Sequence, residues 1–519
     1  MDTNDSQPSA ITKAAVITGV ALLLGVLFDY FFYGKFLGIA FPLYVALIIT
    51  TFFVLILFCK QHLHPEALWL APPLLFFSIM VFVRTSEPLT LLNLFASLLL
   101  LILMAEVSIR DRLKNFSIND YLKALPQAGF HFIPPFFRTL SDLLPFRKQS
   151  DGKNILSPVI KGILMAIPVL IIFLLLFASA DLIFQKYLSS FISFDFESET
   201  IFRVILVLLI TCGFTGAYAY ALSQKSQGNA THPESAPGRF GHIESSILLG
   251  SVSGLFFIFI LVQLTYLFGG ESNISAQGFT YAEYARRGFF ELIAVAILSF
   301  LLLLLIEKYI VKKEAAHSRG FKVLSGVLVI EVLIIMASAF TRLSLYENAY
   351  GLTTLRLYSH AFIILLAVVF CLLLYKIYRH GQDTVFALQL FISLMLFLVV
   401  MNILNPDALI ARRNIALFPA TGILDTAYLS SLSDDALPVA IQLLETSNAE
   451  IRNSFGSALY QRVQRRLELP QTSQWNSAGW QSLNISRLVA EKIIRSQLPK
   501  LQQYRDYQPQ DGAAVILYP

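Results

Sequence analysis

The sequence has little charge for its length. Asp, Glu, Lys and Arg make up 14% of the 519 residues, hydrophobic residues make up 56%, and the mean hydropathy is +0.66. Soluble domains carry roughly 25% charged residues, and a single soluble core stops growing near about 250–300 residues. One large soluble domain is therefore excluded. The composition favours helices that lie in lipid, where each buried charge costs free energy.

Cysteine and the common catalytic motifs are also scarce. Cys59, Cys212 and Cys371 lie in apolar segments without a CxxC pair, so we interpret them as small core residues rather than disulfide or metal-binding cysteines. The sequence lacks a phosphate-binding loop, an HExxH zinc motif, a nucleophile elbow and a kinase signature. No metal or cofactor is predicted. Five histidines lack ligand spacing and are interpreted as solvated: His62, His64, His131, His232 and His242.

What the chain does have is apolar segments. In windows of about 19 residues it resolves into about eleven of them, most near the roughly 20 residues that cross the membrane. They are continuous rather than alternating, which predicts helices, because isolated strands would leave backbone groups unpaired in lipid. The expected fold class is all-α, a polytopic membrane helix bundle. The segments are 14–33, 37–59, 67–83, 89–108, 158–179, 201–223, 244–268, 288–307, 321–340, 355–376 and 384–402.

Two of these segments leave a question of interpretation. The third, 67–83, is short, so a full span and a re-entrant helix are both open. The first follows Asp2, Asp5 and a single Lys13 and has no small-x-small cleavage pattern, so we expect a membrane helix rather than a signal peptide.

The loops carry unequal charge, which predicts the orientation. Lys and Arg in loops after even-numbered segments outnumber those in the other loops by roughly twenty to eight. The positive-inside rule therefore places the N-terminus in the cytoplasm, and an odd number of spans places residues 403–519 outside. The same bias accounts for the net charge of +5, so nucleic acid is not an expected partner; the lipid bilayer is.

The chain divides into four regions by composition. Residues 1–108 hold four membrane helices, 109–157 form a basic cytoplasmic loop, 158–402 hold seven helices, and 403–519 form a small helical cap. The basic loop is expected to lie along the interface as amphipathic pieces, with a solvated loop as the alternative. Residues 224–242 are expected to be a flexible linker. Three helices are predicted in the cap. The first covers 425–445, the second follows a capping box at Ser447–Glu450, and the third lies within 484–504.

Four segments that are expected at the outer face carry unusual polar residues: Tyr266–Gly270, Tyr281–Leu292, Arg342–Tyr358 and Asn405–Asn414. Clustered arginines suit a phosphate or carboxylate, because the guanidinium fork binds such oxygens bidentately. The alternatives are a structural lattice of ion pairs that ties the helix ends to the cap, and catalysis. The candidate ligand-binding residues are Glu283, Arg286, Arg287, Glu291, Arg342, Tyr346, Glu347, Arg356, Asp407, Arg412, Arg413 and Asn414.

Glu331 is a separate candidate near the middle of the segment 321–340. An ionised carboxylate at that depth costs about 2.5 kcal/mol or more, so it is expected to face the bundle, protonated or paired. Arg356 and His360 on the next segment lie at a suitable depth to be partners. A functional acid and a satisfied structural acid are both open.

The same motifs carry a resemblance. Together with Phe177–Asp181 and the stretch from Leu424 to Pro438, the four outer segments resemble the DUF4173 family, which comprises bacterial polytopic membrane proteins of unknown function. The resemblance covers most of the chain from about residue 155 onward. It implies a multi-pass protein of the bacterial cytoplasmic (inner) membrane and supplies no activity.

Three classes of function follow as hypotheses. The first is binding or transport of an anionic ligand or lipid headgroup at the outer face. The second is a membrane transferase that uses a lipid-linked donor, with Glu283, Glu347 or Asp407 as the base. The third is a sensory or assembly subunit whose cap binds a partner protein. A polar pocket among the arginines would favour the first two, and an ion-paired outer surface would favour the third.

Overall fold

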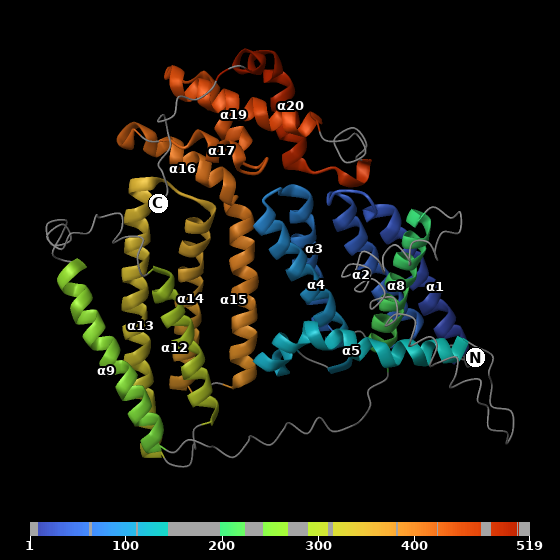
Figure 1. The fold of residues 1–519 in the computed structure, drawn as a ribbon. Helices are drawn as coiled ribbons and strands as arrows, with labels where there is room; N and C mark the ends of the chain where they lie inside the picture. The colour runs from blue at the N-terminus through green and yellow to red at the C-terminus, as the bar shows by residue number, and fades with distance from the viewer. Residues whose placement is uncertain are drawn as a thin grey trace, which may run out of the picture.

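Every regular element that the structure describes is a helix, as expected. The structure is a computed structural model, in which nine helices of the described part are long and apolar enough to cross a membrane. Figure 1 shows them as a bundle with further helices stacked at one end. The described residues are 9–61, 65–110, 113–143, 198–223, 242–267, 289–309, 315–379, 382–422, 424–468, 479–505 and 507.

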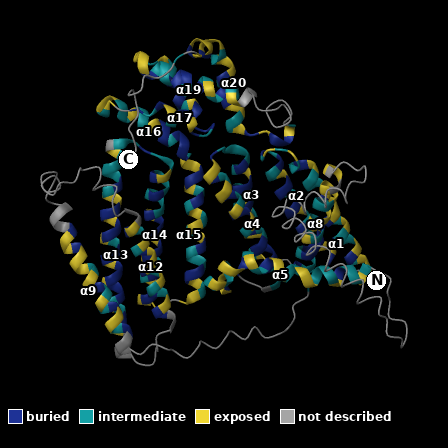
Figure 2. Cartoon of the chain, in the orientation of Figure 1, coloured by how far each residue is buried: buried dark blue, intermediate teal, exposed yellow. Residues whose placement is uncertain are grey.

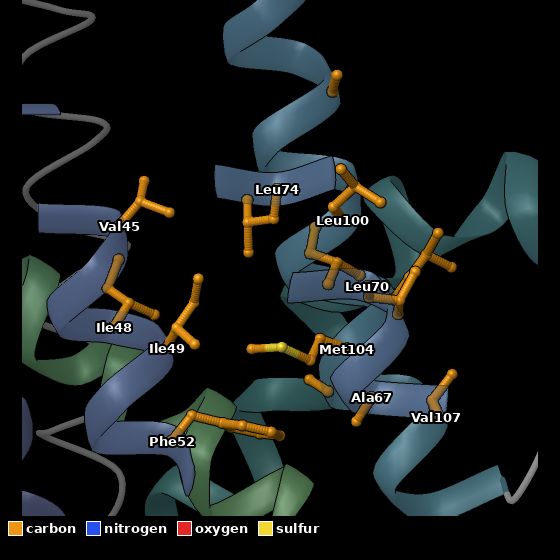
Figure 3. Packing of buried hydrophobic residues seen from close by; sticks show 14 of the residues in the cluster. Val45, Ile48, Ile49, Phe52, Ala67, Leu70, Leu74, Leu100, Met104 and Val107 are labelled. Atoms are coloured by element: carbon orange, nitrogen blue, oxygen red, sulfur yellow. The ribbon is translucent and has the colours of Figure 1, made fainter. Parts of the chain in front are cut away.

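The first group of membrane helices shares one apolar core. Figure 3 shows Ile48, Ile49 and Phe52 of α2 pointing toward Leu74 of α3 and Met104 of α4. A further helix, α5, runs crosswise beneath this group, so the expected interfacial piece is one long helix (Figure 1). The group comprises α1 (Ala10–Phe32), α2 (Ala40–Phe58), α3 (Pro65–Val83), α4 (Glu87–Arg110), α5 (Ile118–Leu143) and α8 (Ser198–Ala221).

A second group has a core of its own, and one helix joins the two. α15 (Asp383–Leu404) contributes Phe386 to the second core and Phe391, Leu398 and Met401 to the first. Because the same helix is buried in both cores, it fixes the two groups relative to each other. The second group comprises α9 (His242–Leu267), α12 (Phe289–Tyr309), α13 (Ala315–Tyr350) and α14 (Thr354–Arg379).

The helices follow the expected segments closely, with differences at particular places. Segment 67–83 forms α3, a 19-residue helix that qualifies as a span. α13 is 36 residues long and continues well past the expected end at residue 340. Cys371 is exposed rather than a core residue. The expected segment 158–179 and residues 224–241 of the expected linker lie outside the described residues, and His242 begins α9.

Large apolar side chains are exposed on the outside of the bundle. On α9, for example, Leu255 is 65% and Ile258 60% exposed, and exposed residues follow the outer faces of the helices in Figure 2. Soluble monomers rarely expose apolar patches of this extent. These faces therefore fit a lipid environment.

Short helices form a cap at the end of the bundle opposite to the N-terminal start of α1 (Figure 1). They bury a third apolar cluster, in which Ile451, Phe455, Leu459 and Val463 form the expected buried face of α19. The cap comprises α16 (Pro406–Thr421), α17 (Thr426–Ser431), α18 (Leu437–Ala440), α19 (Ala449–Glu468) and α20 (Ile485–Leu501).

Two details of the cap correct the sequence analysis. The helix expected over 425–445 is broken into α17, α18 and a short 3₁₀ helix, Ile441–Glu445. The break falls at Ser433, whose hydroxyl accepts a hydrogen bond from the backbone N–H of Asp435, a local bond that competes with helix. α19 is capped by Asn448, whose Oδ1 accepts from the N–H groups of Glu450 and Ile451, and not by Ser447.

Candidate functional site

The structure brings several predicted outer-face residues together where the cap meets α13 and α14. Glu347, near the end of α13, lies 3.4 Å from Nδ1 of His360 and 3.8 Å from Nε of Arg413 on α16. Arg413 also donates to Oδ1 of Asn348 at 3.4 Å. One carboxylate thus contacts a membrane helix and the cap at the same time.

The turn between α13 and α14 is fixed by two more predicted residues. Gly351 turns the chain at φ +78°, a value that favours glycine. Asn414 of α16 accepts from the N–H of Leu352 at 2.6 Å and donates to its carbonyl at 2.9 Å. Arg356 is buried, donates to the carbonyl of Gly351, and lies with its guanidinium 4.1 Å from the centre of the Tyr346 ring. One arm of the Arg356 guanidinium therefore binds the backbone of the turn, and its face lies against Tyr346.

Asp407 belongs to a different cluster, centred on Asp435. The carboxylate of Asp435 is fully buried and accepts from the backbone N–H groups of Thr85 and Ser86, at 2.7 and 3.0 Å, in the turn between α3 and α4. Arg84 lies 3.7 Å away and also donates to the carbonyl of Asn402. Burial, and then the neighbouring Asp435, raise the pKa of Asp407. Two carboxylates thus lie close together at the base of the cap.

The cap side of this cluster adds its own contacts. Oγ of Ser486 lies 2.5 Å from Oδ1 of Asp435 and 2.8 Å from the carbonyl of Val83, and Nδ2 of Asn484 donates to the carbonyls of Val81 and Arg84. These bonds join the start of α20 to the end of α3. We call the contacts of Asp435 and of Glu347 together the cap junction.

The remaining predicted residues are dispersed. Glu291 is exposed in the first turn of α12, and Arg412 is exposed on α16. Arg342 is half-buried on α13. Glu283, Arg286 and Arg287 lie outside the described residues.

Glu331 is buried, as expected, but its neighbour differs from the expected one. The hydroxyl of Ser253 on α9 donates to Oε2 of Glu331 at 2.6 Å. Arg356 and His360, the partners considered from the sequence, make their contacts at the cap junction. The acid joins α13 to α9 at mid-helix.

A polar cluster that the sequence analysis missed lies at the other end of the bundle. Glu106 of α4 is buried; its Oε1 lies 3.1 Å from Nδ1 of His131 on α5, and its Oε2 accepts from the hydroxyl of Tyr220 on α8 at 3.1 Å. The rings of His131 and Tyr220 are stacked, with centres 5.5 Å apart. His131 is thus paired rather than solvated, which corrects the expectation. We call these three residues the inner triad.

The inner triad adjoins an apolar cavity between α2, α4, α5 and α8. The cavity volume is about 280 Å³, near the lower limit of ligand sites. Ala105, Phe132 and Ala221, each next in sequence to a member of the triad, line it, and Phe132 contacts the ring of Tyr220 with centres 5.6 Å apart. Other lining residues include Ile48, Phe52, Met104, Leu209, Gly213 and Phe214.

The signal for the inner triad was present in the sequence. Glu106 is an acid at the end of the apolar segment 89–108, and the reasoning that singled out Glu331 applies equally to it. Only the crosswise course of α5 brings His131 to it, and nothing in the sequence fixes that course.

Comparisons with known proteins identify a family and no activity. The model of a family described as a domain of unknown function (DUF4153) matches residues 71–443. The DUF4173 family suggested by the motifs is not the one that matches, so that specific assignment is not confirmed. No curated protein and no solved structure matches the chain.

Proposed function

Since the chain belongs to the family described as a domain of unknown function (DUF4153), we propose on its own geometry that it is a multi-pass membrane protein that binds one lipid molecule. A lipid tail lies in the cavity between α2, α4, α5 and α8, and the polar end of the lipid contacts the inner triad. The single observation that carries this proposal is an apolar cavity beside a Glu–His–Tyr cluster whose glutamate is buried, built by the same helices.

The two parts of the site have different roles. Lipid tails are as apolar as the cavity walls, so a tail gains little hydrophobic free energy by leaving the bilayer. The cavity therefore selects by shape, and the polar end supplies affinity. Glu106 accepts from Nδ1 of His131 and so orients the ring. The side chain of His131 is 31% exposed, and its Nε2 edge would hydrogen-bond to the headgroup.

The orientation is also part of the proposal. We place the start of α1 and α5 in the cytoplasm and the cap outside the bacterial cytoplasmic membrane. The charge bias of the loops supports this placement, as does the position of the cap opposite to the start of α1. The inner triad then lies near the cytoplasmic leaflet.

Three of the predicted outer-face residues then have a structural role rather than a ligand. Arg356 binds backbone carbonyls, Arg413 contacts Glu347, and Asn414 binds Leu352. An anion at this place would have to displace these contacts. The contacts that hold the cap to the helices support a second candidate function, the presentation of the cap to a partner protein.

The test is a substitution that fills the cavity. Gly213 lines it, and a Cβ at this position meets no atom within 4 Å. We expect wild-type protein purified in mild detergent to retain a lipid, seen by native mass spectrometry, and Gly213→Phe to lose it. The matched control is Gly250→Phe on α9, where a Cβ also meets nothing and which does not line the cavity. If Gly213→Phe retains the same lipid as wild type and the control, the proposed function is wrong.

A further inference from the structure

The exposed large apolar side chains of the cap are confined to one short stretch. Among the described residues after α15, every exposed large apolar side chain lies between residues 480 and 489. The other large apolar side chains among the described residues of the cap are buried or half-buried. We call this stretch the apolar edge. Its exposed members are Trp480 (46%), Leu483 (39%), Ile485 (41%), Leu488 (46%) and Val489 (42%).

The apolar edge is held at the level where the first membrane helices end. The N–H of Ile39, just before α2, donates to the carbonyl of Leu483 at 2.8 Å, and the N–H of Phe36 donates to Oγ of Ser482 at 3.1 Å. The ring of Trp480 contacts Phe31 in the last turn of α1, with centres 5.8 Å apart. The edge therefore cannot lie far from the boundary of the bilayer.

The apolar edge and the loop before α2 approach each other closely. A Cβ on Gly38 would lie 2.4 Å from the carbonyl oxygen of Leu483, so only glycine fits at this approach. Beside it, Tyr30 near the end of α1 and Phe36 in the loop that follows are exposed by 48% and 47%. The apolar edge is thus continuous with the lipid-facing surface of α1.

Two cationic side chains near the apolar edge also fit a position at the membrane boundary. Nζ of Lys35 lies 4.6 Å from the centre of the Tyr30 ring, and the guanidinium of Arg487 lies 5.2 Å from that of Phe36. Aromatic residues together with Lys and Arg are typical of the headgroup level of membranes. A cation at this level lies within reach of lipid phosphates.

From these observations we propose that the apolar edge inserts into the headgroup–acyl boundary of the leaflet on the cap side. Its partner is the bilayer surface itself, and not a second protein. The cap is then held by two contacts, the cap junction with the helices and the apolar edge with lipid. This inference depends neither on the proposed cavity ligand nor on which face is cytoplasmic.

Tryptophan quenching in lipid nanodiscs tests the inference on the full chain. The sequence has three tryptophans, so Trp69→Phe with Trp475→Phe leaves Trp480 alone. We expect lipids brominated near the headgroup end of the acyl chain to quench Trp480 more strongly than lipids brominated at the chain end. Trp69 as the single tryptophan, 77% exposed on α3, is the positive control. Gln461→Trp on α19, without the native tryptophans, is the control away from the membrane.

The outcomes separate the alternatives. The inference is overturned if brominated lipid quenches Trp480 no more strongly than it quenches a tryptophan at position 461. Protection of Trp480 from both brominated lipid and aqueous acrylamide overturns it as well, because a protein surface then covers the edge. Quenching by lipid that persists in Gly213→Phe supports the inference whether or not the cavity binds lipid.

Discussion

Asp435 should control whether the cap stays attached to the membrane helices. Its buried carboxylate accepts from two backbone N–H groups of the turn between α3 and α4 and lies 3.7 Å from Arg84. Removal of one partner from a buried ion pair costs about 3–5 kcal/mol, and in Asp435→Ala the N–H groups of Thr85 and Ser86 also lose their acceptor. We therefore expect Asp435→Ala to weaken the cap junction by about this amount. At about 1.4 kcal/mol per factor of ten, the open population rises between a hundredfold and a few thousandfold.

Limited proteolysis in mild detergent measures that population. When opening and closing are fast relative to cleavage, the cleavage rate follows the equilibrium fraction of open protein. Asp435→Asn keeps the size but removes the charge and should lie between wild type and Asp435→Ala. The control is Arg495→Ala, which breaks an exposed pair with Glu491 on α20 and should change stability by less than about 1 kcal/mol. Cleavage of Asp435→Ala in the cap at the wild-type rate would refute the reasoning.

Three further predictions follow from the same contacts. Reporter fusions after residues 115 and 315 should read cytoplasmic and a fusion after 415 extracytoplasmic; a cytoplasmic reading at 415 would contradict the proposed orientation. Glu331→Gln should leave the melting temperature unchanged or raise it, because the amide oxygen can still accept from Ser253 and the desolvation cost disappears; a drop of several degrees would show that the charge is required. Burial raises the pKa of Asp407 above 3.8, so its contribution to stability is complete below that pH and is lost as the pH rises through the folded pKa. Asp407→Asn should therefore be more stable than wild type at neutral pH and equal to it in acid, by thermal unfolding across pH; equal curves at every pH would contradict the assignment.

Hydropathy predicted the membrane helices well because continuous apolar sequence has few alternatives in lipid. The segment 384–402 became Asp383–Leu404, and 14–33 became Ala10–Phe32. Hydropathy did not predict the end of a helix where tertiary contacts extend the helix through polar sequence. α13 runs on to Tyr350 because Glu347 finds His360 and Arg413, and a window average cannot register such partners.

Within the cap, local rules predicted helices but not their breaks. Leu429, Leu432, Ala436 and Leu443 have helical spacing and are all buried, yet the chain between them is interrupted. Besides the local bond at Ser433, part of the reason lies far away in sequence: Asp435 is held by the turn between α3 and α4, about 350 residues earlier. A pattern within one segment contains no information about such a partner.

The polar side chains at the two ends of the bundle have different surroundings, and this difference argues for a ligand at the inner end. At the outer end, Arg356, Arg413 and Asn414 each donate to protein groups, and Asp435 is fully buried. At mid-membrane Glu331 is buried with a hydroxyl donor. The inner triad differs, because the cavity beside it has room that side chains do not fill. A ligand needs such room, so we propose that Arg356, Arg413 and Asn414 mainly hold the cap and that the cavity is the place to look for a ligand.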